Sequence, residues 1–437
     1  MNTVLSKFQD LPRLLLVILV LGLAVRISFV VLHDRPLISD EKEYDQLAYS
    51  IAAEGSYSYD GAPTAYRPVG YPAVVAVIYR VAGHEPIIVK LVQALLDAIV
   101  PLILYQLLSG LSQRAKLLAA AFWAFYPPAI LYSNFLLSES SFTFLLALSV
   151  LLLLRSDPQK KTLALLTGIL FGMLALMKPS FLLFLALLPL MFLVLHLPAQ
   201  RLWWIGLGAL LLVAPWVVRN YATFGSATLS TNGGINFLIG NNPNATGAYN
   251  VNFPEGILDG ARTEVEADRL AFQYATDYVL SRPGFFVVNG VKKIAHLFES
   301  EGGVLVWTFS GDPEDASTRF SAKYASLPPA LILAVNLPYF LLLLAGVVGF
   351  LAFPEPKLWW AFLVLLAAWL LTHGIFFGGS RFHFPLMPYF AAFGAWWLSY
   401  LPESFRGMSK TRKTLAAAAM VGLMAVWAFE GIAIYSA

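Results

Sequence analysis

The amino-acid sequence predicts an all-α polytopic integral membrane protein. Hydrophobic residues make up 58% of its 437 positions and charged residues only 13%, against roughly a quarter in a soluble domain. Apolar segments of about 20 residues, the length that crosses a bilayer core, recur along most of the chain. The composition and the segment lengths together exclude a water-soluble protein of this size.

We expect about eleven membrane-spanning helices. The first apolar segment follows basic residues, as a signal peptide would. No small-residue cleavage site follows it, however, and it is long enough to span, so we expect a retained helix. The expected spans are 13–32, 87–108, 117–133, 135–154, 163–178, 180–197, 202–218, 330–352, 358–377, 384–401 and 414–435.

Basic residues gather in alternate short loops, which predicts the orientation of the chain. With the N-terminus in the cytoplasm, two long loops at 33–86 and 219–328 lie outside, as does the C-terminus. The chain then divides into a transmembrane catalytic module at 1–218, which includes the first loop, the second outside loop, and C-terminal transmembrane helices at 329–437. The basic residues of the cytoplasmic side are Lys7, Arg13, Arg114, Lys116, Arg155, Lys160, Lys161, Arg201, Lys357, Arg406, Lys410, Arg412 and Lys413.

The two outside loops contain further helix signals. Residues 41–53 favour a helix with Ser39 or Asp40 as its N-cap. Residues 71–81 are apolar but too short to span, so we expect a helix lying at the membrane interface. The second loop carries a Gly- and Asn-rich segment, a predicted helix and an amphipathic stretch, at 233–247, 262–280 and 284–298.

Several kinds of site are excluded or disfavoured. The chain has no cysteine, so it has no disulfide, thiolate metal site or cysteine nucleophile. The glycines around Gly233 and Gly240 lack the strand–helix context of a nucleotide-binding loop. A nucleotide-sugar donor is therefore disfavoured, and we expect no nucleic-acid partner.

Ionisable residues at membrane depth are candidates for function. Arg26 and Asp97 have opposite charges at similar depth, and we interpret them as a structural ion pair that joins two helices. The other charges gather at the outer edge, where cations would hold an anionic lipid phosphate and carboxylates would handle a proton or a metal. The cations are Arg67, Lys178 and Arg381, and the carboxylates are Asp40 and Glu139.

The motifs resemble those of the GT-C glycosyltransferase superfamily, which includes protein O-mannosyltransferases and lipid A aminoarabinose transferases. The first loop reads Ser39-Asp40-Glu41 and later Arg67-Pro68-Val69-Gly70-Tyr71-Pro72. An acidic motif in this loop is the shared mark of the superfamily, and the basic residue before Pro-x-Gly-Tyr-Pro is typical of its bacterial branch. Similar pieces follow in order at Tyr126-Pro127, Ser138-Glu139, Lys178-Pro179, Pro215-Trp216, Arg219-Asn220, Gly240-Asn241-Asn242 and Arg381-Phe382.

The resemblance implies a GT-C-type fold and an inverting transfer of sugar from a polyprenyl-phosphate carrier, at the outer face of a bacterial inner membrane. The superfamily's catalytic acid carries over to Asp40, with Glu41 beside it, and its second acid to Glu139. Its phosphate-binding cation carries over to Arg67, and further phosphate contacts are expected from Lys178, Arg381 and His383. A divalent metal between Asp40 and Glu139 is left open.

The acceptor, which would be a lipid, a glycan or a protein, also stays open. Two other functions compete with the transferase. A secondary transporter would explain many spans with charges, but the chain shows no repeated halves and no paired broken helices at the membrane midplane. A non-catalytic subunit of GT-C ancestry would keep the fold without the chemistry.

Overall fold

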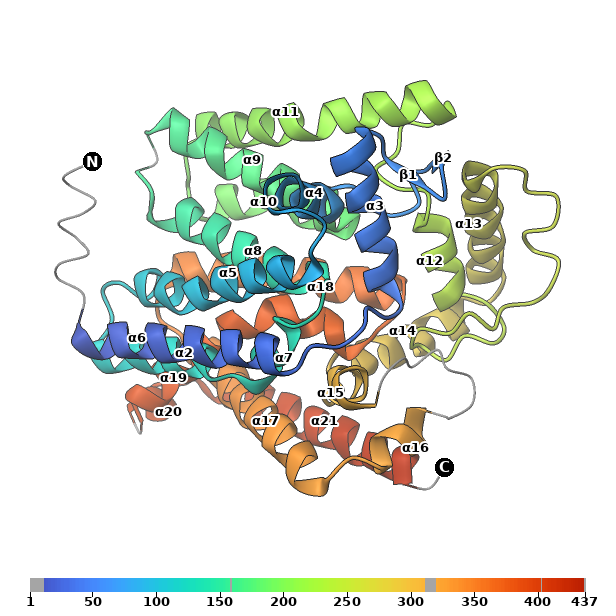
Figure 1. The fold of residues 1–437 in the computed structure, drawn as a ribbon. Helices are drawn as coiled ribbons and strands as arrows, with labels where there is room; N and C mark the ends of the chain where they lie inside the picture. The colour runs from blue at the N-terminus through green and yellow to red at the C-terminus, as the bar shows by residue number, and fades with distance from the viewer. Residues whose placement is uncertain (1–11, 158, 311–319, 402, 436–437) are drawn as a thin grey trace.

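The computed structural model describes residues 12–157, 159–310, 320–401 and 403–435 (Figure 1). Lys7 and residues 311–319 of the second predicted outside loop lie outside these ranges. The described residues are helical almost throughout, which confirms the all-α class. Seven of their helices are long and apolar enough to cross a membrane. These are α2 (Arg13–Leu32), α5 (Pro86–Leu107), α8 (Ser138–Arg155), α11 (Ala199–Phe224), α17 (Pro329–Ala352), α18 (Pro356–Ile375) and α21 (Lys410–Tyr435).

The remaining predicted spans fall on shorter or broken helices. The predicted span 117–133 is not one helix, because Tyr126 is extended before Pro127 and separates two helices. This follows the general restriction that proline places on the preceding residue. The predicted span 384–401 likewise begins in a 3₁₀ turn. The helices concerned are α6 (Gln113–Ala124), α7 (Pro127–Tyr132), α9 (Lys161–Met177), η1 (Pro179–Phe181), α10 (Leu182–Val194), η2 (Ser380–Leu386), α19 (Met387–Ser399) and the short α20 (Glu403–Arg406).

The two helices predicted in the first long loop are present. Helix α3 (Asp40–Glu54) covers the predicted helix 41–53, and α4 (Gly70–Ala82) covers 71–81. A two-stranded hairpin of β1 (Ser58–Tyr59) and β2 (Ala62–Pro63) lies between them. Ser39 precedes α3 with φ 45°, and its side chain makes no capping hydrogen bond. Strained backbone of this kind is uncommon outside glycine and recurs at functional sites.

The second outside loop is more helical than its composition indicates. Its predicted helices correspond to α13 (Glu264–Ser281) and α14 (Pro283–Leu297). The glycine-rich segment, for which the sequence predicts no helix, contains α12 (Gly233–Gly240). Gly234 explains the close packing of α12 on α13, because a Cβ there would lie 1.9 Å from the Asp268 carbonyl oxygen. Two short helices complete the described part of the loop, α15 (Gly302–Phe309) and α16 (Phe320–Ala325).

Most long helices run side by side across Figure 1, and the outside-loop helices α3, α12, α13 and α15 gather at one end of the bundle. Glycines allow the closest helix contacts, as is common for helices packed in a membrane. A Cβ at Gly168 of α9 would lie 2.0 Å from the Ile205 oxygen of α11. A Cβ at Gly349 of α17 would lie 2.2 Å from the Phe393 oxygen of α19.

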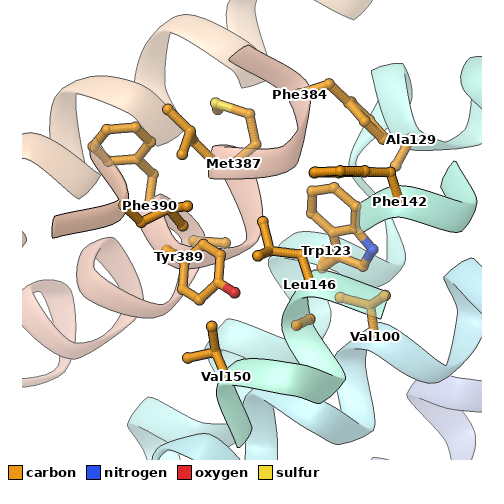
Figure 2. Packing of buried hydrophobic residues seen from close by; sticks show 14 of the residues in the cluster. Val100, Trp123, Ala129, Phe142, Leu146, Val150, Phe384, Met387, Tyr389 and Phe390 are labelled. Atoms are coloured by element: carbon orange, nitrogen blue, oxygen red, sulfur yellow. The ribbon is translucent and has the colours of Figure 1, made fainter. Parts of the chain in front are cut away.

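The interior of the bundle is closely packed. Figure 2 shows Trp123 of α6, Phe142 and Leu146 of α8, and Met387 and Phe390 of α19 meeting in one apolar cluster. All five side chains are buried. This core connects α8, which carries Glu139, to η2, which carries Arg381, and so fixes the relative positions of two predicted site residues.

Candidate active site

A single carboxylate lies between two arginines at the end of the bundle where the outside-loop helices gather. The Asp40 Oδ1 atom accepts a hydrogen bond from Arg67 Nη2 at 2.8 Å, and its Oδ2 atom accepts one from Arg381 Nη1 at 2.7 Å. Arg67 also donates from Nε to Glu43 Oε2 at 2.5 Å. Three segments distant in sequence meet here: the start of α3, the loop before α4, and η2.

The arginines determine the charge state of Asp40. Burial raises the pKa of the Asp40 carboxyl, but the charges and hydrogen bonds of Arg381 and Arg67 outweigh burial and bring the pKa down to about 2. Burial lowers the pKa of both arginines, but the charges and hydrogen bonds of their partners, that of Asp40 first, outweigh burial and raise the pKa. Asp40 is therefore ionised at neutral pH, and in this arrangement it is a weak base.

The second predicted pair lies nearby. Lys178, between α9 and η1, donates from Nζ to Glu139 Oε1 at 3.1 Å. Glu139 is in the first turn of α8 and is almost fully buried, whereas Lys178 is 17% exposed at its side chain. The carboxylate therefore holds the lysine at the edge of the site.

Four of these groups line one large cavity, and Glu139 is not among the described residues that line it. The volume of the cavity is about 1240 Å³, and Asp40, Arg67, Lys178 and Arg381 all line it. Apolar residues of α10 and α18, among them Leu183 and Trp369, form another part of its wall. Polar residues from the second outside loop line it as well, among them Asn232, Asn236 and Glu264. The cavity thus combines cations, an apolar wall and a polar wall.

Glu41, predicted beside the catalytic acid, is engaged in structural contacts. It is 1% exposed. Its Oε1 atom accepts from the Leu136 backbone N–H at 2.7 Å, and its Oε2 atom accepts from Arg35 at 2.8 Å and from the Ile38 backbone at 3.1 Å. These bonds tie the segment before Asp40 to the turn that leads into α8.

His383, predicted to bind phosphate, lies in the protein interior. Its Nδ1 atom is 2.8 Å from the Leu297 carbonyl oxygen and its Nε2 atom is 3.0 Å from Glu301 Oε1. Both the His383 and Glu301 side chains are fully buried. Within the part of the chain that the structure describes, His383 is not among the residues that line the large cavity.

Two residues of α11 and α13 hold the segment that precedes Arg67. The sequence analysis indicates only one of them. Arg219 donates to the backbone oxygens of Thr64 and Tyr57 at 2.8 and 3.1 Å. Glu264 accepts from the Thr64 hydroxyl and the Ala65 N–H at 2.8 and 2.7 Å. The end of a predicted span marks Arg219, but Glu264 has no sequence signal because its partners lie 199 and 200 residues away.

The oxygens of Asp40 are not free to bind a divalent metal ion in this arrangement. Both Asp40 oxygens are bonded to arginines, so a cation would have to displace a guanidinium group. Among the described residues there is also no group of three or more histidine and carboxylate side chains that would hold a metal. We therefore derive no step through a metal ion.

Neither a scan against protein-family models nor a search of curated proteins gives a match. Solved structures do match at low identity. The oligosaccharyltransferase of Archaeoglobus fulgidus, in the apo form, is 14% identical with a TM-score of 0.48, over 94% of this chain and 54% of that one. The same values hold for the AglB enzyme of that organism in complex with an inhibitory peptide and a dolichol-phosphate. This chain thus spans about half the length of those enzymes.

A third match is ArnT from Cupriavidus metallidurans bound to undecaprenyl phosphate. It is 14% identical with a TM-score of 0.41, over 88% of this chain and 77% of that one. The matched proteins belong to the GT-C superfamily that the sequence motifs resemble. All of these TM-scores lie below 0.5, so we base the function on this chain's own residues.

Proposed function

We propose that this protein is an inverting glycosyltransferase that moves a sugar from a polyprenyl-phosphate carrier to an acceptor hydroxyl. One observation carries the proposal. Arg67, Lys178 and Arg381 line the same cavity as the carboxylate of Asp40. A lipid phosphate needs fixed cations at the edge of a membrane, and glycosyl transfer needs a carboxylate beside them.

The donor fits the two parts of the cavity wall. Its phosphate would bind the guanidinium groups of Arg67 and Arg381, whose planar forks suit phosphate oxygens, with Lys178 adding a third charge. Its prenyl chain would follow the apolar wall of α10 and α18, where Leu183 and Trp369 lie. The bundle end that carries the arginines would then be the outer edge of the membrane.

The reaction requires one bond to form and one to break. The acceptor oxygen attacks the anomeric carbon, and the bond from that carbon to the phosphate oxygen breaks with its electron pair. The lipid phosphate leaves with that pair, stabilised by the arginines, while the acceptor proton passes to a carboxylate and then to water. Asp40 is the proposed proton acceptor, with Glu139 acting beside it through Lys178.

Donor binding would make Asp40 a better base. In the free protein Arg381 and Arg67 hold its pKa at about 2 against the effect of burial. A phosphate that takes over either arginine removes part of that stabilisation, so the pKa of Asp40 rises on binding. We assign Glu41 a positioning role, because all of its contacts tie the Asp40 segment to the turn before α8.

The acceptor would enter along the polar wall. A cavity of about 1240 Å³ exceeds the roughly 300–1,000 Å³ of ordinary ligand pockets. It has room for a sugar-phosphate head and part of an acceptor together. Glu264, Asn232 and Asn236 belong to this polar wall. The acceptor hydroxyl would be that of a lipid, a glycan or a protein.

We place the site on the outer face of a bacterial inner membrane, because the basic short loops favour a cytoplasmic N-terminus. The cysteine-free chain suits single-cysteine labelling in intact spheroplasts. An impermeant thiol reagent should label a cysteine at Tyr66 or Gly83 and leave one at Ser112 or Ser409 unlabelled. Labelling of either serine position would reverse the proposed orientation.

Purified protein with a radiolabelled polyprenyl-phosphate sugar tests the function directly. We expect sugar to appear on an acceptor and free polyprenyl phosphate to accumulate in equal amount. An acceptor mixture of membrane lipids, glycans and envelope proteins, followed by mass spectrometry, would identify the acceptor class. If no donor in a panel of carrier-linked sugars is consumed by folded protein, the proposal is wrong.

A further inference from the structure

Tyr132, the last residue of α7, lies in the wall of the large cavity. It is 1% exposed. Its ring packs on Phe384 and Phe135, with centroids 4.5 and 6.2 Å away. The aromatic neighbours fix the ring, so its hydroxyl has a defined position in the wall.

The Tyr132 hydroxyl is buried yet makes no hydrogen bond to any residue that the structure describes. A buried hydroxyl without a partner destabilises the folded state, and a phenylalanine would fill the same space without that cost. Among buried polar side chains lacking a partner in the described ranges, only Tyr132 and Thr231 also line this cavity. Thr231 belongs to the segment between α11 and α12, where its N–H donates to the Ala65 oxygen.

Three charged groups act on the hydroxyl, two carboxylates and one cation. They are Glu301, Glu139 and Arg381. Arg381 is one of the arginines that contact Asp40, and Lys178, the partner of Glu139, lines the same cavity. The neutral hydroxyl of Tyr132 thus belongs to the wall of the same cavity as the cations expected to hold the donor phosphate.

We propose that Tyr132 donates a hydrogen bond from its hydroxyl to a phosphate oxygen of the bound polyprenyl-phosphate donor. This rests on the proposed function and adds a substrate-contacting residue that neither the motifs nor the charges of the sequence indicate. Because the hydroxyl is neutral, it would orient the phosphate through a directional hydrogen bond and add no charge to the site. It would keep its bond to the phosphate as negative charge grows on the leaving oxygen.

The test compares Tyr132→Phe with a matched control in the core. Tyr389 is also 1% exposed and its hydroxyl also lacks a partner among the described residues. It packs in the apolar cluster of Figure 2 and is not one of the described residues that line the cavity. Both substitutions should leave the melting temperature equal to or above that of the wild type, because each removes an unsatisfied buried hydroxyl.

Only Tyr132→Phe should weaken binding of undecaprenyl phosphate. We expect a loss of about 10- to 100-fold, as for a hydrogen bond to a charged group, measured by titration in detergent. Undecaprenol, which lacks the phosphate, should bind both variants and the wild type alike. Unchanged undecaprenyl phosphate affinity in Tyr132→Phe would overturn the proposal, and so would an equal loss for undecaprenol or for Tyr389→Phe.

The phosphate preference of the wild type and that of Tyr132→Phe test the proposed function and the Tyr132 contact separately. If wild-type protein bound undecaprenyl phosphate no better than undecaprenol, the proposed function itself would be wrong, and the assignment of Tyr132 with it. If the wild type preferred the phosphate and Tyr132→Phe kept that preference in full, only the Tyr132 contact would be wrong.

Discussion

Two carboxylate–arginine clusters in this protein differ in how completely their hydrogen bonds are satisfied. Arg26 and Asp97 join α2 and α5 at 2.7 Å with both side chains fully buried. The other Arg26 nitrogens donate to backbone oxygens of Gly22, Trp123 and Ala124. Asp97 also accepts from the Trp123 indole at 3.2 Å. This first pair is closed within the protein.

The second cluster is open. Asp40, Arg67 and Arg381 are 18–26% exposed at their side chains and line the large cavity. Two arginines share the carboxylate of Asp40, and Glu43, which is more exposed, pairs with Arg67, so the four groups are formally neutral. An anion in the cavity would bind the guanidinium groups in competition with these carboxylates. The same side-chain types therefore stabilise the fold where packing encloses them, and form a candidate binding site where they line a cavity.

The largest expected effect follows from Asp40→Asn in the open cluster. Loss of the proton acceptor should lower the transfer rate by roughly 10²–10⁴-fold with folding preserved. Undecaprenyl phosphate affinity should hold or rise, because asparagine competes less for Arg67 and Arg381. Rate assays and titrations on the same purified variant measure both, and a near wild-type rate would exclude Asp40 as the base.

In the closed cluster the effect should fall on stability instead. Arg26→Met leaves a buried charge on Asp97 and should cost about 3–5 kcal/mol of folding free energy. Turnover per folded molecule should stay unchanged. The double variant Arg26→Met/Asp97→Leu should recover much of the loss, because it buries no lone charge. Detergent unfolding curves measure this, and an equal loss in both variants would contradict the explanation.

Two substitutions of Arg67 distinguish the contribution of its charge from that of its planar two-point contact. Arg67→Ala should weaken undecaprenyl phosphate binding by about 10- to 100-fold through loss of a charge-assisted bond. Arg67→Lys should keep part of the affinity without the two-point contact. Arg80, an exposed arginine of α4, provides the control, and Arg80→Ala should bind normally. Full affinity in Arg67→Ala would remove Arg67 from the proposed phosphate site.

The lowered pKa of Asp40 should make the stability difference between the wild type and Asp40→Asn depend on pH in the acid range. The pKa falls from 3.8 to about 2 in the folded protein, so the ion pairs stabilise the folded state above about pH 4 and are lost towards pH 2. The melting temperature of the wild type minus that of Asp40→Asn should stay constant from pH 7 to about 5 and shrink below that. A difference that already changes between pH 7 and 6 would point to another group.

The smallest effect is expected from Glu43→Gln. Glu43 is 34% exposed at its side chain and accepts from Arg67 Nε, whereas Asp40 accepts from Arg67 Nη2. Partly exposed ion pairs contribute about 0–1 kcal/mol, so we expect a change of a few-fold or less in undecaprenyl phosphate affinity. Titrations of Glu43→Gln and Arg67→Ala with undecaprenyl phosphate, made side by side, compare the two losses of affinity. A loss as large as that of Arg67→Ala would make Glu43 essential for holding the arginine.

The sequence by itself determined the class of the protein, the outside-loop helices α3 and α4, and the Arg26–Asp97 pair. These depend on the length and polarity of continuous segments, or on opposite charges at one depth, which are local properties. It also identified Asp40, Arg67, Lys178 and Arg381, all of which the structure places along one cavity.

Only the tertiary structure decided which of those residues contact each other and which of their sequence neighbours face away from the cavity. Asp40 and Arg381 are 341 positions apart, and no local pattern encodes such a contact. Arg381 and His383 are two residues apart in one 3₁₀ turn, yet the turn directs one to the cavity and the other to Glu301. A one-residue step from Asp40 likewise carries Glu41 from the cavity to Leu136. The side that each residue faces depends on the elements packed around it, and that packing exists only in the folded chain.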